Sequence, residues 1–146
     1  MTNRRVLLSR EFVVSAPFDR VWTELAAVER WPTWARHIRS VRLDPRGALR
    51  SDTVGTLLLA GGVTSTFRMV ELHPGRSWRW EGGFLWLWIS YDHVFTAVDE
   101  GRTRVRFDVA AEGFAVGTLG RLFAAIYGRN LDRAIPRLVA LLQRGV

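Results

Sequence analysis

The sequence contains no cysteine, no lysine and only two methionines in 146 residues. Without cysteine there is no disulfide bond, no thiolate metal ligand and no cysteine nucleophile. A chain of this kind suits a reducing compartment, and we expect a cytoplasmic protein. Without lysine, all 21 basic residues are arginine, and with 14 acidic residues they give a formal net charge of +7.

Long hydrophobic runs are also missing. The longest uncharged apolar run extends from Phe84 to Ile89, which is too short to cross a bilayer. Near the N-terminus, apolar residues 6–8 are followed at once by polar and charged residues, so they are too few for a signal peptide. We therefore predict no transmembrane segment and no signal peptide.

Sequence motifs for well-known chemistries are absent as well. His37, His73 and His93 lie on separate predicted elements without the spacing of metal ligands, and no His-Glu-x-x-His motif occurs. There is no phosphate-binding loop, no dinucleotide-binding glycine motif and no Gly-x-Ser-x-Gly. We expect no metal and no cofactor, and the sequence alone does not decide whether the protein is an enzyme.

The positive charge has several interpretations. A basic surface attracts nucleic acid, anionic lipid or acidic proteins, or it only keeps the protein dissolved. Arg102, Arg104 and Arg106 alternate along one predicted strand and form a charged stripe. Nucleic-acid binding would require stacking aromatic side chains beside this stripe, and only Trp86 and Trp88 qualify. We interpret the stripe as a solvated face and expect no nucleic-acid partner.

The composition, 48% hydrophobic and 24% charged, is typical of a globular protein, and we predict a single domain over residues 1–146. Hydrophobic periodicity predicts a strand, a helix, a broken helical turn, six strands and a long final helix. The expected strands are 6–14, 39–44, 53–60, 63–73, 76–81, 84–98 and 102–112. The first helix starts at Pro17, the broken helical segment surrounds Pro32, and the final helix covers 117–143, where Pro136 should bend it.

Two predicted turns, at residues 82–83 and 99–101, set which side chains share a face of the sheet. The pairs that follow are Trp80 with Leu85, Trp78 with Leu87, Phe95 with Val105, His93 with Phe107 and Tyr91 with Val109. Because side chains alternate along a strand, both turns place these apolar residues on one face and the arginines on the other. A strand as long as 84–98 must curve. We expect a curved antiparallel sheet around the final helix, with an apolar cavity where the helix does not reach.

Three segments carry a resemblance to a known family. They are VSAPFDRVWTELAAVERWPTW, YDHVFTAVDEGRTRV with its His-x-Phe, and GTLGRLFAAIYGRNLDRAIPRLVALL. In this order they resemble the polyketide cyclase/dehydrase members of the START-like, helix-grip superfamily, over nearly the whole chain. The resemblance implies an α+β helix-grip fold: seven antiparallel strands gripping the C-terminal helix, two short N-terminal helices, and a hydrophobic ligand cavity between sheet and helix. No catalytic motif of the family can be carried over residue by residue.

The candidate ligand site is the apolar face of this sheet, together with the facing side of the final helix. Its predicted lining is Trp31, Trp34, Trp78, Trp80, Leu85, Leu87, Ile89, Tyr91, His93, Phe95, Val105, Phe107, Phe123 and Tyr127. Such a set is also what an ordinary core would contain, and the resemblance favours the ligand site. Trp31 and Trp34 would form a lid, or a packing plug over one end of the sheet.

His93 is the sharpest single candidate among the side chains predicted to point into this cavity. It is a candidate for ligand contact through a hydrogen bond, a weaker candidate for general acid/base catalysis, and equally a histidine of the core. Trp86 and Trp88 should point to the opposite, wet face. There they could stack on Arg79, form a homodimer contact or touch a membrane surface, unless a β-bulge turns them inward.

These observations predict that the protein binds a small hydrophobic ligand that is lipid-, polyketide- or aromatic-like. Aromatic walls would supply most of the affinity, and His93 and Tyr91 the polar orientation. One alternative is a polyketide cyclase or dehydratase that uses the same cavity. Another is a protein-interaction module that uses Trp86, Trp88 and the arginine face.

Overall fold

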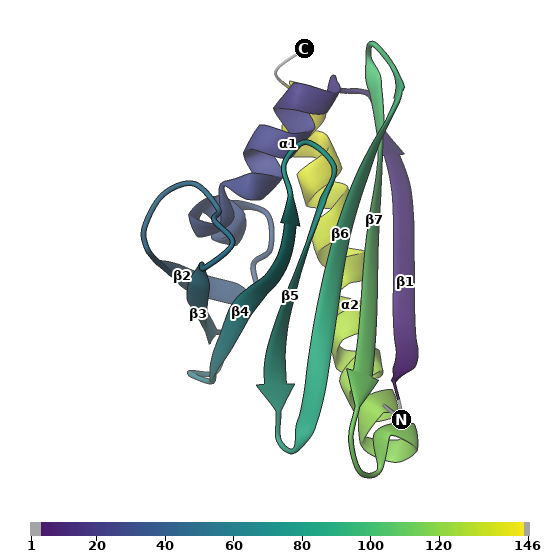
Figure 1. Cartoon of the computed structure of the whole chain (residues 1–146). Helices are drawn as coiled ribbons and strands as arrows, with labels where there is room; N and C mark the ends of the chain where they lie inside the picture. The colour runs from purple at the N-terminus through teal and green to yellow at the C-terminus, as the bar shows by residue number, and fades with distance from the viewer. Residues whose placement is uncertain (1–3, 145–146) are drawn as a thin grey trace.

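A computed structural model describes residues 4–144 of the chain (Figure 1). The elements, in order, are β1 (Arg5–Val14), α1 (Phe18–Ala26), the 3-10 helix η1 (Val28–Thr33), β2 (Ile38–Asp44), β3 (Val54–Leu59), β4 (Thr64–His73), β5 (Ser77–Phe84), β6 (Leu87–Asp99), β7 (Arg102–Glu112) and α2 (Val116–Arg144). All predicted elements are confirmed, and each boundary differs by a few residues at most. The helix α2 continues through Pro136.

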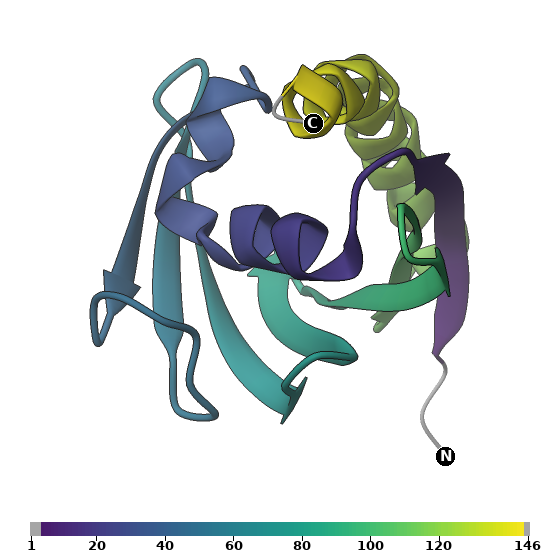
Figure 2. The same cartoon turned by 90° about the horizontal axis from the view of Figure 1, so that it is seen from above.

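The seven strands form one antiparallel sheet with the order β1-β7-β6-β5-β4-β3-β2. Figure 2 shows that the sheet curves, with α1, η1 and α2 all on its concave side. The sheet remains open, so that β1 and β2 are its two edge strands. A curved seven-stranded sheet, a long C-terminal helix and two short N-terminal helices confirm the helix-grip fold.

The long helix α2 is fixed against the edge strand β1. A β-bulge between Val6 and Leu8 interrupts the alternation, so that two consecutive leucines lie close to the helix. The helix offers glycines there: a Cβ at Gly120 would lie 2.9 Å from Leu7 Cδ2, and one at Gly128 would lie 3.7 Å from Leu8 Cδ2. Small residues let the helix approach this edge of the sheet closely.

An ion pair reinforces the same contact. The Arg10 Nε donates to a carboxylate oxygen of Asp132 over 2.8 Å, which joins β1 to the middle of α2. The hydrogen bond from Arg10 lowers the pKa of Asp132 below its ordinary value. The helix therefore lies along one side of the concave face rather than over its centre.

The short helix α1 closes the other end of the structure. Pro17 is the capping residue with an extended backbone, one position before the helix, rather than its first helical residue. Val21 and Leu25 are fully buried, as their spacing predicts. Arg20 donates to the carbonyl oxygen of Leu142 over 2.8 Å, so α1 is tied to the C-terminal end of α2.

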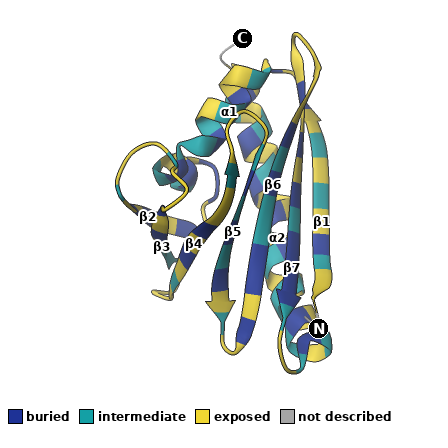
Figure 3. Ribbon diagram, viewed as in Figure 1, coloured by how far each residue is buried: buried dark blue, intermediate teal, exposed yellow. Residues whose placement is uncertain are grey.

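The hairpin between β6 and β7 has the predicted register. Phe95 pairs with Val105, and His93 pairs with Phe107. Apolar side chains of β7 are buried, whereas Arg104 is exposed. Figure 3 shows the buried and exposed positions along the strands of the sheet.

The predicted turn at Gly82-Gly83 is wrong. Both glycines continue β5, the two-residue turn is formed by Leu85 and Trp86, and Trp80 pairs with Tyr91 rather than with Leu85. The physical reason lies in the neighbouring strand β4, because a Cβ at Gly82 would lie 2.6 Å from the backbone oxygen of Thr66. The glycine at this position allows two strands to approach, and it does not make the turn.

The observed register changes which residues of β5 and β6 pair, but it leaves each side chain on its predicted face of the sheet. The partner of Trp80 moves from Leu85 to Tyr91, which is six positions along the strand, an even number. Side chains on β5 and β6 therefore keep the predicted sides of the sheet. Leu85 is the exception: it lies in the turn, is 70% exposed and does not line the concave face.

No helix within residues 4–144 is both long enough and apolar enough to cross a membrane.

The close approach at Gly82 generates a stability prediction. Gly82→Ala should lower the free energy of unfolding by about 1–3 kcal/mol, because the new methyl group collides with backbone atoms that cannot rotate away. Gly83→Ala is the matched control, since its Cβ would meet nothing closer than 3.9 Å. Urea denaturation of both variants measures the difference, and equal stabilities would contradict this account of the hairpin.

Candidate functional site

The predicted cavity residues fall into three groups. Ten are buried on the concave face: Trp31, Trp34, Trp78, Trp80, Leu87, Ile89, His93, Phe95, Val105 and Phe107. Tyr91, Phe123 and Tyr127 are partly buried. Leu85 is exposed in the β5–β6 turn, as described above.

The buried group forms a closed aromatic cluster around His93. The imidazole stacks on Trp78 with a ring-centroid distance of 4.8 Å and meets Trp80 edge-on at 4.9 Å. Trp31 lies 5.8 Å from it, and the Trp31 indole nitrogen donates to the carbonyl oxygen of Leu25 over 2.8 Å. Trp31 and Trp34 are 7% and 3% exposed, so they plug the interior beside this cluster.

His93 is enclosed on all sides and remains neutral. It is 4% exposed, and its Nδ1 has no hydrogen-bond partner within residues 4–144. Burial lowers the pKa of His93 to about 3, and the carbonyl groups of Trp78 and Tyr91 only partly oppose this effect. An imidazole with so low a pKa is a weak base, since general acid/base catalysis near pH 7 favours a pKa close to that pH.

The partly buried residues form a second group, which we call the tyrosine group: Phe84, Tyr91, Phe123 and Tyr127. Tyr127 of α2 lies 5.6 Å from Tyr91 of β6 and stacks on Phe123 at 5.5 Å. Phe123 also contacts Phe84 of β5 at 5.1 Å. This group bridges the sheet and the N-terminal half of α2, which is where the sequence places the cavity.

The phenol side chains of Tyr91 and Tyr127 are partly buried, but they still reach solvent. Burial raises the pKa of Tyr91, with a further contribution from Tyr127, and burial alone raises the pKa of Tyr127. Neither hydroxyl belongs to the buried side-chain atoms without a hydrogen-bond partner within residues 4–144, and no other side chain there pairs with one, so both are open to water. Both side chains accordingly keep accessible surface. At neutral pH they are protonated hydrogen-bond donors without protein acceptors.

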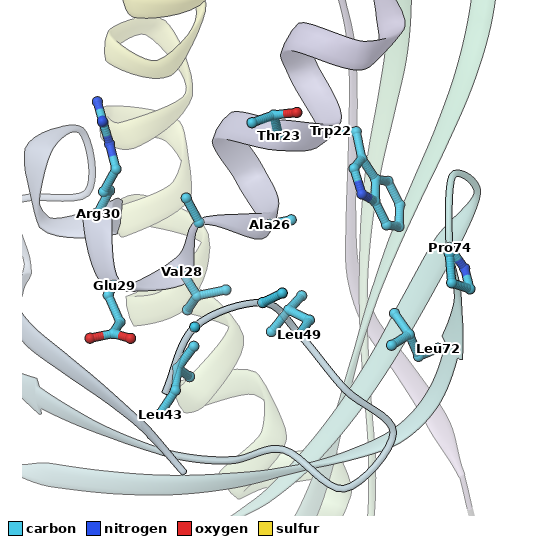
Figure 4. Close-up of a pocket in the computed structure, with 13 residues that line it drawn as sticks. Trp22, Thr23, Ala26, Val28, Glu29, Arg30, Leu43, Leu49, Leu72 and Pro74 are labelled. Atoms are coloured by element: carbon cyan, nitrogen blue, oxygen red, sulfur yellow. The ribbon is translucent and has the colours of Figure 1, made fainter. Parts of the chain in front are cut away.

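A pocket lies elsewhere, beside α1, and we call it the α1 pocket (Figure 4). Its volume is about 460 Å³. The residues that line it are Trp22, Thr23, Ala26, Ala27, Val28, Glu29, Arg30, Leu43, Gly47, Ala48, Leu49, Leu72 and Pro74. The ring of Trp22 meets Trp78 edge-on at 5.3 Å, so the α1 pocket adjoins the closed aromatic cluster.

Sequence reasoning did not find the α1 pocket. Its walls come from α1, η1, β2, the loop after β2 and the end of β4, which are far apart in the sequence. Hydrophobic periodicity within one segment cannot predict this pocket. Leu49 and Leu72 belong to separate segments, and only the fold brings them to the same pocket. The sequence alone therefore does not assign the apolar side chains of the α1 pocket to a site.

Both surface tryptophans are exposed, as predicted, although Trp86 lies in a turn rather than on a strand. Trp86 lies in the β5–β6 turn, 58% exposed, and its indole nitrogen donates to the carbonyl oxygen of Phe114 over 2.6 Å. Trp88 lies on the convex face, where its indole nitrogen donates to Glu81. The predicted stacking of Arg79 on Trp86 is wrong, since Arg79 pairs with Asp92 across the corrected register, at 2.7 Å.

The arginine stripe is engaged with neighbouring carboxylates. Its three members, Arg102, Arg104 and Arg106, form ion pairs with Asp99, Glu11 and Asp108, respectively. Within residues 4–144, no group of three or more histidine, aspartate and glutamate side chains is arranged to hold a metal ion.

The depressed pKa of His93 predicts how stability depends on pH. The unfolded chain binds a proton near pH 6.5, whereas the folded chain binds it only near pH 3. The contribution of neutral His93 to the free energy of unfolding is therefore complete above pH 6.5. As the pH falls from 6.5 toward 3, this contribution is lost by up to about 1.4 kcal/mol per pH unit. His93→Leu should make the pH dependence of urea unfolding shallower in this window. His73→Leu, at an exposed position, should leave it unchanged, and equal slopes for both variants would contradict the burial of a neutral His93.

Similar folds occur in solved structures of low sequence identity. The ZhuI aromatase/cyclase from a Streptomyces species has a TM-score of 0.76 at 20% identity, covering 97% of this chain and 95% of that one. Norcoclaurine synthase from Thalictrum flavum has a TM-score of 0.68 at 12% identity, covering 98% and 88%. A START superfamily protein from Mycobacterium smegmatis has a TM-score of 0.72 at 13% identity, covering 95% and 98%.

No curated protein sequence matches the chain. A family model does: that of the family described as polyketide cyclase / dehydrase and lipid transport matches residues 5–143, nearly the whole sequence. The match extends from β1 to the last turn of α2 and so includes every element of the helix grip. The chain is therefore a member of the polyketide cyclase / dehydrase and lipid transport family.

Proposed function

We propose that this protein binds a small apolar ligand between the sheet and α2, against the tyrosine group. The observation that carries the proposal is the state of Tyr91 and Tyr127. Both phenols lie deep enough for burial to raise the pKa, yet they keep accessible surface and have no protein hydrogen-bond partner. In the free protein water can pair with these hydroxyls, and a bound ligand with a suitable acceptor would take the place of that water.

The surroundings of the phenols indicate the kind of ligand. The adjacent walls are the aromatic rings of Phe84 and Phe123, which favour a flat or extended apolar molecule. The two hydroxyls donate hydrogen bonds, so they suit carbonyl or ether oxygens on that molecule. An aromatic or polyketide-like ketone fits this combination, and the solved aromatase/cyclase of similar fold supports that class.

The structure supports binding more than catalysis. A cyclase or dehydratase moves protons and requires a base, whereas a pKa of about 3 makes His93 a weak base, and the closed aromatic cluster encloses it. The raised pKa keeps Tyr91 and Tyr127 protonated, so that they orient a carbonyl rather than remove a proton. We therefore place orientation of the ligand, rather than proton abstraction, at the tyrosine group.

A planar diketone tests the proposal, and 1,8-dihydroxyanthraquinone is a suitable probe. Wild-type protein should bind it with one-to-one stoichiometry, measured by isothermal calorimetry. Tyr127→Phe removes only the hydroxyl and should weaken binding by about 3–10-fold, the effect of one hydrogen bond. Tyr91→Phe should do the same, while circular dichroism and the thermal midpoint stay close to wild type.

The α1 pocket supplies the control. Leu49→Trp fills part of that pocket with a large ring and should leave the affinity for the probe unchanged. If Leu49→Trp abolishes binding while both tyrosine variants bind normally, the ligand site is the α1 pocket and the proposal fails. Absence of any binding by the wild-type protein contradicts it as well.

A further inference from the structure

Exposed apolar side chains gather at one end of the molecule, and we call this region the apolar tip. Its members are Leu85 (70% exposed), Trp86 (58%), Phe114 (84%), Leu122 (55%) and Ile126 (55%). They come from the β5–β6 turn, the loop after β7 and the first turns of α2, which lie at the same end of the sheet (Figure 1). Isolated surface leucines are ordinary, but a group of five from three elements indicates an interaction surface.

The two loops of the apolar tip are held as one unit. The Trp86 indole donates to the Phe114 carbonyl oxygen, which joins the β5–β6 turn to the loop after β7. Leu85 and Ala115 have positive φ angles of 54° and 61°, and no other non-glycine residue within 4–144 does. Such backbone costs free energy and persists where its surroundings hold it. Here it supports loops whose side chains Leu85 and Phe114 extend into solvent.

Basic side chains outnumber acidic ones beside the apolar tip, where the carboxylates are Glu112, at the end of β7, and Glu81, which accepts a hydrogen bond from Trp88. The segments 82–88 and 113–126 contain a single charged residue, Arg121. Arg121 and Arg129 are exposed on α2, on either side of Leu122 and Ile126. The Arg5 guanidinium lies at the start of the same helix, 3.0 Å from the position that a Cβ of Gly117 would occupy. A cluster of large apolar side chains is therefore bordered by guanidinium groups.

We propose that the apolar tip docks on the surface of an anionic lipid bilayer. Leu85, Trp86 and Phe114 would enter the interfacial layer, where tryptophan is favoured. Arg121 and Arg129 would contact headgroup phosphates, which attract juxtaposed basic residues. This proposal does not depend on the ligand site, although Phe84 and Phe123 of the tyrosine group adjoin the same end.

Other occupants fit the apolar tip less well. A second copy of the chain could cover the apolar residues, but it would bring together two surfaces bordered by arginine on molecules that each carry +7. A nucleic acid would pair with the guanidinium groups and leave Leu85, Leu122 and Ile126 uncovered. An anionic bilayer satisfies both the apolar and the basic parts of the surface.

Vesicle sedimentation tests the proposal. The protein should sediment with vesicles of equal parts phosphatidylcholine and phosphatidylserine, and much less with phosphatidylcholine alone. Trp86→Ser with Phe114→Ser should lower the partition coefficient on the mixed vesicles by at least about tenfold. Val13→Ser with Val70→Ser is the matched control, since both valines are 47% exposed away from the tip.

A second pair of variants separates the basic from the apolar contribution. Arg121→Gln with Arg129→Gln, on the exposed face of α2, should weaken binding to mixed vesicles and reduce its dependence on salt. Leu122→Ser with Ile126→Ser, in the same exposed stripe, should reproduce the loss without touching either loop. Circular dichroism confirms that each variant is folded.

Three results would overturn the proposal. The first is absence of sedimentation with mixed vesicles. The second is undiminished binding by both the Trp86/Phe114 and the Leu122/Ile126 variants. The third is a dimer in analytical ultracentrifugation that forms without lipid and is disrupted by Trp86→Ser with Phe114→Ser, because a second copy would then occupy the tip.

Discussion

The contact between α2 and the edge strand β1 determines how the rest of the concave face is used. Glycines on the helix face consecutive leucines on the strand, and the ion pair of Arg10 with Asp132 holds the two together. A helix drawn to one edge of a curved sheet cannot cover its centre. Side chains from β5, β6 and η1 must fill that remaining space, and they do so with large aromatic rings because the distance to be bridged is long.

The aromatic filling divides into two parts with different chemistry. Around His93 the rings pack on one another, the polar atoms lose water, and a histidine becomes a neutral member of the core. Toward the N-terminal half of α2, Tyr91 and Tyr127 are only partly buried and keep accessible surface. The closed aromatic cluster contributes stability, and the tyrosine group is the place where we propose that a ligand binds. The boundary lies along β6, between residues 91 and 93.

Much of this arrangement is predictable from the sequence, and the failures have a common origin. Alternation along β6 and β7 gives the correct faces, and the loop before Arg102 gives the correct register, because both depend on local backbone geometry. The prediction of a turn at Gly82-Gly83 fails because glycine occurs both in tight turns and where two strands approach closely. The close approach of β4 to Gly82 is a tertiary contact that the local sequence does not reveal. The division between closed and open aromatic groups also depends on where α2 rests, and the α1 pocket depends on where the loop at Leu49 folds.

The open form of the sheet leaves unpaired backbone groups along both of its outer strands. On β2 the exposed positions include Arg39 and Arg42, and on β1 they include Arg5. Two copies that tried to extend their sheets through these margins would align like charges a few ångströms apart, which opposes strand addition. In this lysine-free chain, guanidinium groups stand at the sheet edges where lysine often serves the same protective role.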